Sequence, residues 1–155
     1  MWVFYLIAGL TWLFSYLVKR RLKSAYGKWG RVHNTSGATG VQTAYAVLRA
    51  NDLLGVRLVP APGALSDHYD PRSKTIRLSE PVYGVPSVAA TAIAAHEVGH
   101  AIQDQVQYKP FRVRTSLVPL AALGARFGMP AAVIGLVLGA PLYVQIGVLT
   151  YLGAL

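Results

Sequence analysis

The most apolar parts of the chain are two runs near its ends. Residues 1–18 and residues 127–155 contain no Asp, Glu, Lys, Arg or His. As a helix with a rise of about 1.5 Å per residue, residues 1–18 would be roughly 27 Å long, close to the roughly 30 Å of a bilayer's hydrocarbon core. We therefore predict a transmembrane helix over residues 1–18.

A second transmembrane helix is predicted over residues 127–149. It begins after Arg126, because an arginine is costly at the centre of a bilayer, and residues 116–126 are then juxtamembrane. Gly139 inside this span is tolerable, since glycine is commoner in membrane helices than in water-soluble ones. The alternative is a helical hairpin over residues 117–155 with a bend near Gly139.

Between the two runs, the apolar positions follow the periods of short helices and strands. Spacings of three and four residues predict an amphipathic helix over residues 39–51. An alanine-rich run predicts a longer helix over residues 88–107, with Ser87 as its N-cap.

Strands are predicted in the segment that separates these two helices. One is expected at residues 56–59, and a hairpin is expected from residues 65–70 and 75–79, which flank a proline-containing turn. The predicted fold class is α+β: a small domain over residues 19–115, made of helices and short strands and flanked by transmembrane helices.

The composition excludes several classes of protein. Of the 155 residues, 54% are hydrophobic and 14% are charged, which is too apolar for an ordinary soluble domain or a disordered chain. The sequence contains no cysteine. This excludes a disulfide framework, a thiolate zinc finger, an iron–sulfur cluster and a cysteine nucleophile.

The distribution of the net charge of +9 favours a membrane protein. Fourteen of the 15 Lys and Arg residues lie within residues 19–115, so this domain is predicted to be cytoplasmic. A basic cluster at residues 19–23 follows the first apolar run instead of preceding it, which favours an uncleaved anchor over a signal peptide. The lipid bilayer is the expected partner of these charges, and nucleic acid is discounted because no motif for it is present.

The predicted helix over residues 88–107 contains the sequence His96-Glu97-Val98-Gly99-His100. Two histidines four residues apart lie on one helix face within reach of one metal ion, and the glutamate can address a metal-bound water. Zinc would act as a Lewis acid, while Glu97 would take up a proton and pass it to the leaving amine. A chance match is disfavoured, because burying these three side chains without a metal or a partner would be costly.

A third zinc ligand is not evident. Asp104, four residues after His100, suits a supporting role, since zinc-bound histidines commonly donate their other ring N–H to a carboxylate. No His, Asp or Glu follows Asp104, so the third ligand is Asp104 itself, an upstream residue, a residue of another chain, or absent. The upstream candidates are His68, then Asp67 and Asp70, for which hydrogen-bonded turn positions are the alternative.

Several segments together resemble the YugP-type zinc-dependent membrane peptidases of bacteria, a family of neutral zinc metallopeptidases. They are Gly37-Ala-Thr-Gly40, residues 65–79, residues 87–104, Tyr108 and residues 114–119, in the family's order. The resemblance implies a zincin-like core, a peptide or protein substrate, Zn²⁺ as cofactor and a multi-pass location in the bacterial cell membrane. By resemblance, His96 and His100 are zinc ligands and Glu97 is the general base. The strand at residues 76–79 would lie near the active-site helix and pair with an extended substrate.

The chain departs from the family pattern in two places. Val41-Gln42 stands where the family usually has a glutamate. The sequence also ends at Leu155, before a Glu-Phe-Asp-Ala-Ser stretch that resembles the third-ligand helix of glutamate-type zincins. A glutamate beyond Leu155 in a longer chain is therefore a further candidate for the third ligand.

The leading hypothesis is a membrane-anchored zinc endopeptidase. The alternative is a non-catalytic zinc-binding membrane scaffold or adaptor, which the absence of an evident third ligand favours. Intramembrane proteolysis is disfavoured, because polar residues follow the histidine motif and the helix offers no apolar span of about 20 residues. No residue indicates an oligomeric state or a substrate preference.

Overall fold

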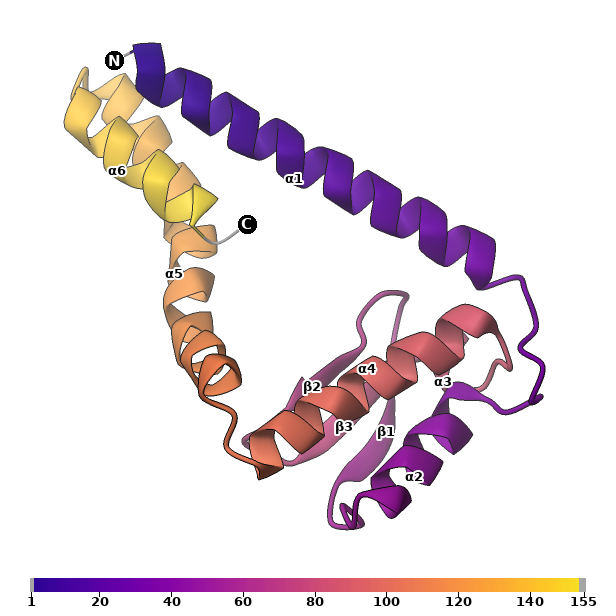
Figure 1. Ribbon diagram of the computed structural model, residues 1–155. Helices are drawn as coiled ribbons and strands as arrows, with labels where there is room; N and C mark the ends of the chain where they lie inside the picture. Colours follow the sequence, from indigo (N-terminus) through magenta and orange to yellow (C-terminus); the bar gives the residue numbers. More distant parts are fainter. Residues whose placement is uncertain (1, 154–155) are drawn as a thin grey trace. The chain divides into compact units, whose positions relative to one another are not determined.

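The computed structural model describes residues 2–153, and their backbone forms a mostly helical structure with one small sheet (Figure 1). The chain divides into two compact units, one formed by Lys23–Arg112 and the other by the segments to Leu22 and from Val113. The elements, in chain order, are α1 (Trp2–Trp29), α2 (Gly40–Ala50), β1 (Arg57–Ala61), β2 (His68–Asp70), β3 (Thr75–Ser79), α3 (Glu80–Tyr83), α4 (Val88–Gln105), α5 (Lys109–Val137) and α6 (Pro141–Leu152).

The sheet has the strand order β1-β3-β2, so β3 is its central strand. β2 and β3 form the antiparallel hairpin predicted from the sequence, with Tyr69 paired to Ile76. β1 runs parallel to β3, with Leu58 opposite Ile76. A parallel pair needs a crossover connection, and here the chain from β1 passes through β2 before it reaches β3.

Two helices cover this sheet and form the core of Lys23–Arg112 with it. α4 packs against β2 and β3, and α2 packs against β1 and α4 (Figure 1). The largest fully buried side chains come from all of these elements and from α3: Leu48, Ile76, Leu78, Val82, Val98, Thr75 and Ser79. The predicted helices at residues 39–51 and 88–107 are thus confirmed within two residues at each end.

Side-chain caps fix where these two helices begin. The Thr39 hydroxyl accepts a hydrogen bond from the N–H of Gln42, whose side chain in turn accepts one from the N–H of Thr39, which is a capping box. The Ser87 hydroxyl accepts a hydrogen bond from the N–H of Ala90, as expected for the predicted N-cap of α4. Both caps satisfy backbone donors that a helix start leaves unpaired.

The first helix extends further than the apolar run that predicted it. α1 continues through the basic cluster to Trp29, whereas the sequence suggested a helix over residues 1–18 and a loop from Gly27. Lysine, arginine and leucine are good helix formers, and no proline interrupts them, so nothing stops the helix at Val18. Met1 lies outside the described residues.

The single helix predicted over residues 127–149 is wrong, because the chain turns back inside it. α5 ends at Val137 and α6 begins at Pro141. Between them, Gly139 has a φ of +62°, a left-handed conformation that glycine adopts readily at a helix C-terminus. Pro141 then occupies the first helical position, where its missing N–H costs nothing. The structure therefore has the alternative that the sequence left open, a helical hairpin with a bend at Gly139.

The two helices of the hairpin pack backbone against backbone through glycines. A Cβ added to Gly147 would lie 2.5 Å from the Gly128 carbonyl oxygen, and one added to Gly135 would lie 2.7 Å from the Val144 nitrogen. Such close packing through small residues is typical of helices that associate within membranes. Among residues 2–153, α5 is the one helix long and apolar enough to cross a membrane by length and composition, where the sequence predicted two spans.

We predict that Gly147→Ala destabilises this hairpin by about 1–3 kcal/mol, because a methyl group would force the two backbones apart. The variant should have a lower Tm in detergent than the wild type. Gly9→Ala is the matched control, since a Cβ there would meet no atom within 4 Å. Equal melting of Gly147→Ala and the wild type would contradict the packing described.

Candidate metal centre

The histidine motif lies on α4, whose buried face holds it against the sheet. Ala94, Val98 and Ala101 are buried in the core, so His96 and His100 lie beside that face, one helical turn apart. Their ring centroids are 4.6 Å apart and the rings meet edge to face, with an interplanar angle of 71°. His96 is exposed and His100 is half-buried. Two imidazoles at this spacing can direct ring nitrogens at one metal ion.

Glu97 is the one acidic side chain of α4 that is buried. It is 7% exposed, and no hydrogen bond or ion pair found within residues 2–153 involves its carboxylate. An ionised carboxylate buried without a partner is costly, so this position calls for a cation or a bound water to compensate it. The His96, Glu97 and His100 side chains therefore fit a metal ion with a water beside it.

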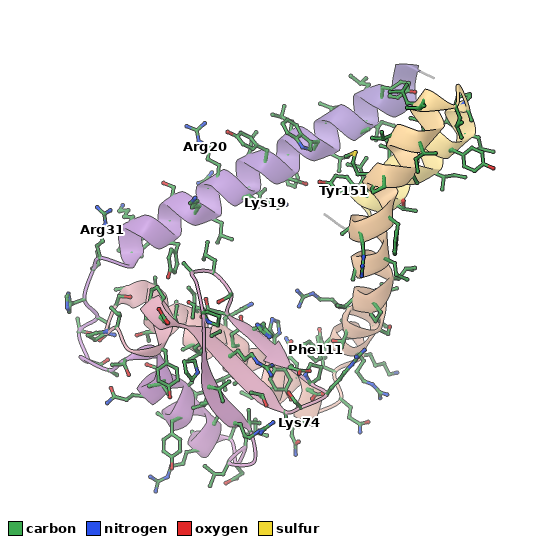
Figure 2. The ribbon with its side chains drawn as sticks, turned by 180° about the vertical axis from the view of Figure 1, so that it is seen from behind. Lys19, Arg20, Arg31, Lys74, Phe111 and Tyr151 are labelled. Carbon is green, nitrogen blue, oxygen red and sulfur yellow. The ribbon has the colours of Figure 1, made fainter. Side chains whose placement is uncertain are left out.

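The surroundings of His100 differ from those expected. Its Nδ1 lies 3.0 Å from Oε1 of Gln103, not from Asp104. Phe111, in the first turn of α5, stacks on the His100 ring with centroids 5.4 Å apart and an interplanar angle of 27° (Figure 2). Position i+3 reaches the same helix face as i+4, which explains how Gln103 takes the place expected for Asp104.

Asp104 joins α4 to the β2–β3 hairpin. Its Oδ2 accepts hydrogen bonds from the Tyr69 hydroxyl at 2.8 Å and from Lys74 Nζ at 2.5 Å. Lys74 reaches it from the end of the hairpin turn (Figure 2). Burial, followed by the hydrogen bond to Asp104, raises the pKa of Tyr69 well above its usual range, so the hydroxyl stays protonated and donates.

We predict that Asp104→Ala loosens the hairpin from α4. It would leave the buried Tyr69 hydroxyl without an acceptor, at a cost of about 1–3 kcal/mol in the free energy of unfolding. Chemical denaturation measures this loss. Asp104→Asn, which keeps an oxygen acceptor for Tyr69, should recover part of it, and the absence of any loss in Asp104→Ala would contradict the assignment.

The upstream candidates for the third ligand have other partners. Both oxygens of Asp67 accept hydrogen bonds from Ser79, one from its N–H and one from its hydroxyl. Asp70 accepts hydrogen bonds from the Ser73 hydroxyl and the Arg72 N–H in the hairpin turn, and these lower its pKa. His68 is exposed, with Nδ1 2.8 Å from the Ser66 carbonyl oxygen.

These contacts leave the histidine pair without an evident third ligand. Within residues 2–153, no group of three or more His, Asp or Glu side chains is placed to hold a metal ion. The structure thus brings together His96, Glu97 and His100, and it does not bring His68, Asp67, Asp70 or Asp104 to them as ligands.

The strand expected to pair with substrate is also differently placed. β3 cannot add a strand, because β1 and β2 already occupy both of its edges. That expectation is wrong for residues 76–79, since paired ladder groups are not free to bind another chain. The sheet edge beside α4 belongs to β2, whose outer side is paired with no strand in the described part of the chain.

Comparison with known proteins agrees with the motif. Residues 4–155 match a family model described as "Putative neutral zinc metallopeptidase". Over 154 residues, the chain is 34% identical to the "Putative membrane protease YugP" of Bacillus subtilis (strain 168), and the match covers 99% of this chain and 68% of that protein. No solved structure matches the chain. The resemblance seen in the sequence is confirmed over almost the whole chain, which belongs to this family of neutral zinc metallopeptidases.

Proposed function

We propose that this chain is a membrane-anchored zinc endopeptidase, in which His96 and His100 bind zinc and Glu97 is the general base. The observation that carries the proposal is the Glu97 carboxylate, which is 7% exposed and lies beside the two imidazoles on α4. Its family membership supports zinc as the metal and a peptide as the substrate.

Bound zinc would supply Lewis-acid chemistry, lowering the pKa of a water and polarising the scissile carbonyl. Glu97 accepts the proton of the attacking water as the new C–O bond forms. It then delivers that proton to the amide nitrogen as the C–N bond breaks, so the products are a carboxylic acid and an amine. His96 and His100 hold the metal and take no proton in this sequence.

The substrate is proposed to bind as an extended strand along the outer edge of β2. Main-chain hydrogen bonds to an open sheet edge give affinity that depends little on sequence. β2 lies near the motif, because its Tyr69 packs on Phe111, which in turn stacks on His100. In this arrangement the core is zincin-like, with an active-site helix beside an edge strand.

Membrane anchoring is proposed for the apolar part of α1 and for the α5–α6 hairpin. α5 has the length and apolar composition of a span, and the glycine-mediated packing of α6 on it suits an apolar solvent. The basic cluster from Lys19 to Lys23 favours a cytoplasmic location for Lys23–Arg112, in a bacterial cell membrane.

The absence of a third ligand among residues 2–153 favours a second candidate, a zinc-binding scaffold without catalysis. Incubating the detergent-purified chain with a mixed peptide library separates the two. The peptidase should cut peptides, stop when a chelator removes its metal, and recover when zinc is returned. Zinc binding without cleavage of any peptide would favour the scaffold and contradict the peptidase.

A further inference from the structure

His100 is held on two sides by residues that the histidine motif does not include. Gln103 Oε1 lies 3.0 Å from its Nδ1, and the Phe111 ring stacks on its imidazole at 5.4 Å between centroids. His96 differs, because within residues 2–153 no hydrogen bond involves its ring and its side chain is exposed. The two histidines are therefore unequal, with His100 the more constrained.

The end of α4 explains how both residues reach one imidazole. Gln103 lies three residues after His100, on the same helix face. The Tyr108 N–H then donates to the Gln103 carbonyl oxygen at 2.8 Å, and Gln107 has a left-handed φ of +53°, so the chain reverses there. This reversal starts α5 beside α4 and brings Phe111, which is 8% exposed, onto the His100 ring.

The Gln103 contact selects one tautomer of His100. A side-chain amide oxygen only accepts hydrogen bonds, so Nδ1 must carry the proton and donate it. Nε2 then keeps its lone pair and is the nitrogen available to a metal. Phe111 limits rotation of the ring about its side-chain bonds, which fixes the direction of that lone pair.

We infer that Gln103 and Phe111 are positioning residues that preset the tautomer and the ring plane of His100 for zinc. The inference rests on the proposed function only in taking His100 as a metal ligand. It also gives the first turn of α5, the helix with the composition of a membrane span, a direct contact with that ligand.

Zinc affinity of the full chain in detergent, measured by competition with a coloured chelator, tests the role of Gln103. Gln103→Leu removes the acceptor and should weaken zinc binding about 10–100-fold, as loss of such a supporting hydrogen bond does elsewhere. Gln103→Glu restores an acceptor and should bind zinc at least as well as the wild type. Gln105→Leu is the matched control, because Gln105 is exposed on the same helix.

A second readout needs no metal. In ¹⁵N histidine spectra of the metal-free protein in alkaline buffer, His100 should be protonated at Nδ1 in the wild type and in Gln105→Leu. In Gln103→Leu it should shift toward the Nε2-protonated tautomer. Phe111→Leu should remove the upfield ring-current shift of the His100 ring protons and weaken zinc binding, whereas Phe111→Tyr should preserve both.

The possible outcomes separate this inference from the proposed function. If the wild type binds zinc and Gln103→Leu matches it in both affinity and tautomer, the positioning role is overturned while the metal site stands. If the wild type binds no zinc, the proposed function fails, and the tautomer measurement still decides whether Gln103 sets the proton on His100.

Discussion

Replacing Glu97 by Gln is expected to lower kcat for peptide hydrolysis by about 10²–10⁴-fold, which corresponds to about 2.7–5.4 kcal/mol in activation free energy. The amide has nearly the shape of the carboxylate but cannot accept the proton of the attacking water. Zinc content per chain should stay at the wild-type level, because the ligands His96 and His100 are untouched. Initial rates and metal analysis on the same preparation measure both quantities.

This variant should also fold at least as well as the wild type when metal is absent. Glu97 is 7% exposed, and in residues 2–153 its carboxylate has no protein partner, so a neutral amide removes a buried charge. A Tm of the metal-free Glu97→Gln protein equal to or above that of the wild type would show that lost turnover is not lost structure. Wild-type turnover in Glu97→Gln would contradict the role of Glu97.

Replacing His96 by Ala should weaken zinc binding by more than the roughly 10–100-fold expected for loss of a supporting hydrogen bond. A two-histidine site that loses one ligand keeps little to hold a metal. The fold should persist, because the His96 side chain is exposed and contributes little to the core. Zinc affinity and circular dichroism measure the two effects.

His68→Ala is the matched control for this prediction. His68 is also an exposed histidine, but its Nδ1 lies beside the Ser66 carbonyl oxygen and it forms no metal-binding group with His96 and His100. Its zinc affinity should equal that of the wild type. Equal losses in His96→Ala and His68→Ala would contradict the placement of the site on α4 alone and make His68 the third ligand.

The sequence predicted the middle of the fold well because its signals there are local. Alanine content and the Ser87 cap specify α4, and the turn at residues 71–74 joins two short runs whose pairing in the β2–β3 hairpin is likewise local. The parallel pairing of β1 with β3 depends on residues far apart in the chain, and no local pattern encodes it. α3 was not anticipated, since four residues with a proline carry too weak a periodic signal.

The errors near the chain ends have a different cause. An apolar run predicts burial or a membrane but contains little information on where a helix stops. The helix break at Gly139 was encoded by a glycine two residues before a proline, a recognised stop and restart signal that the apolar run obscured.

The metal centre was only partly accessible to the same reasoning. His96, Glu97 and His100 follow from helical spacing alone. Gln103 was within reach, since it lies at i+3 from His100, but an acidic residue at i+4 was favoured for its charge. Phe111 was not accessible, because its contact depends on the reversal of the chain at Gln107.

The most direct test of the metal site is X-ray absorption at the zinc edge on the zinc-loaded chain in detergent. We predict the scattering signature of two imidazole ligands, falling to one in whatever zinc remains bound to His96→Ala and staying at two in His68→Ala. A spectrum without imidazole scattering, or one that is the same in the wild type and in His96→Ala, would contradict zinc binding by His96 and His100.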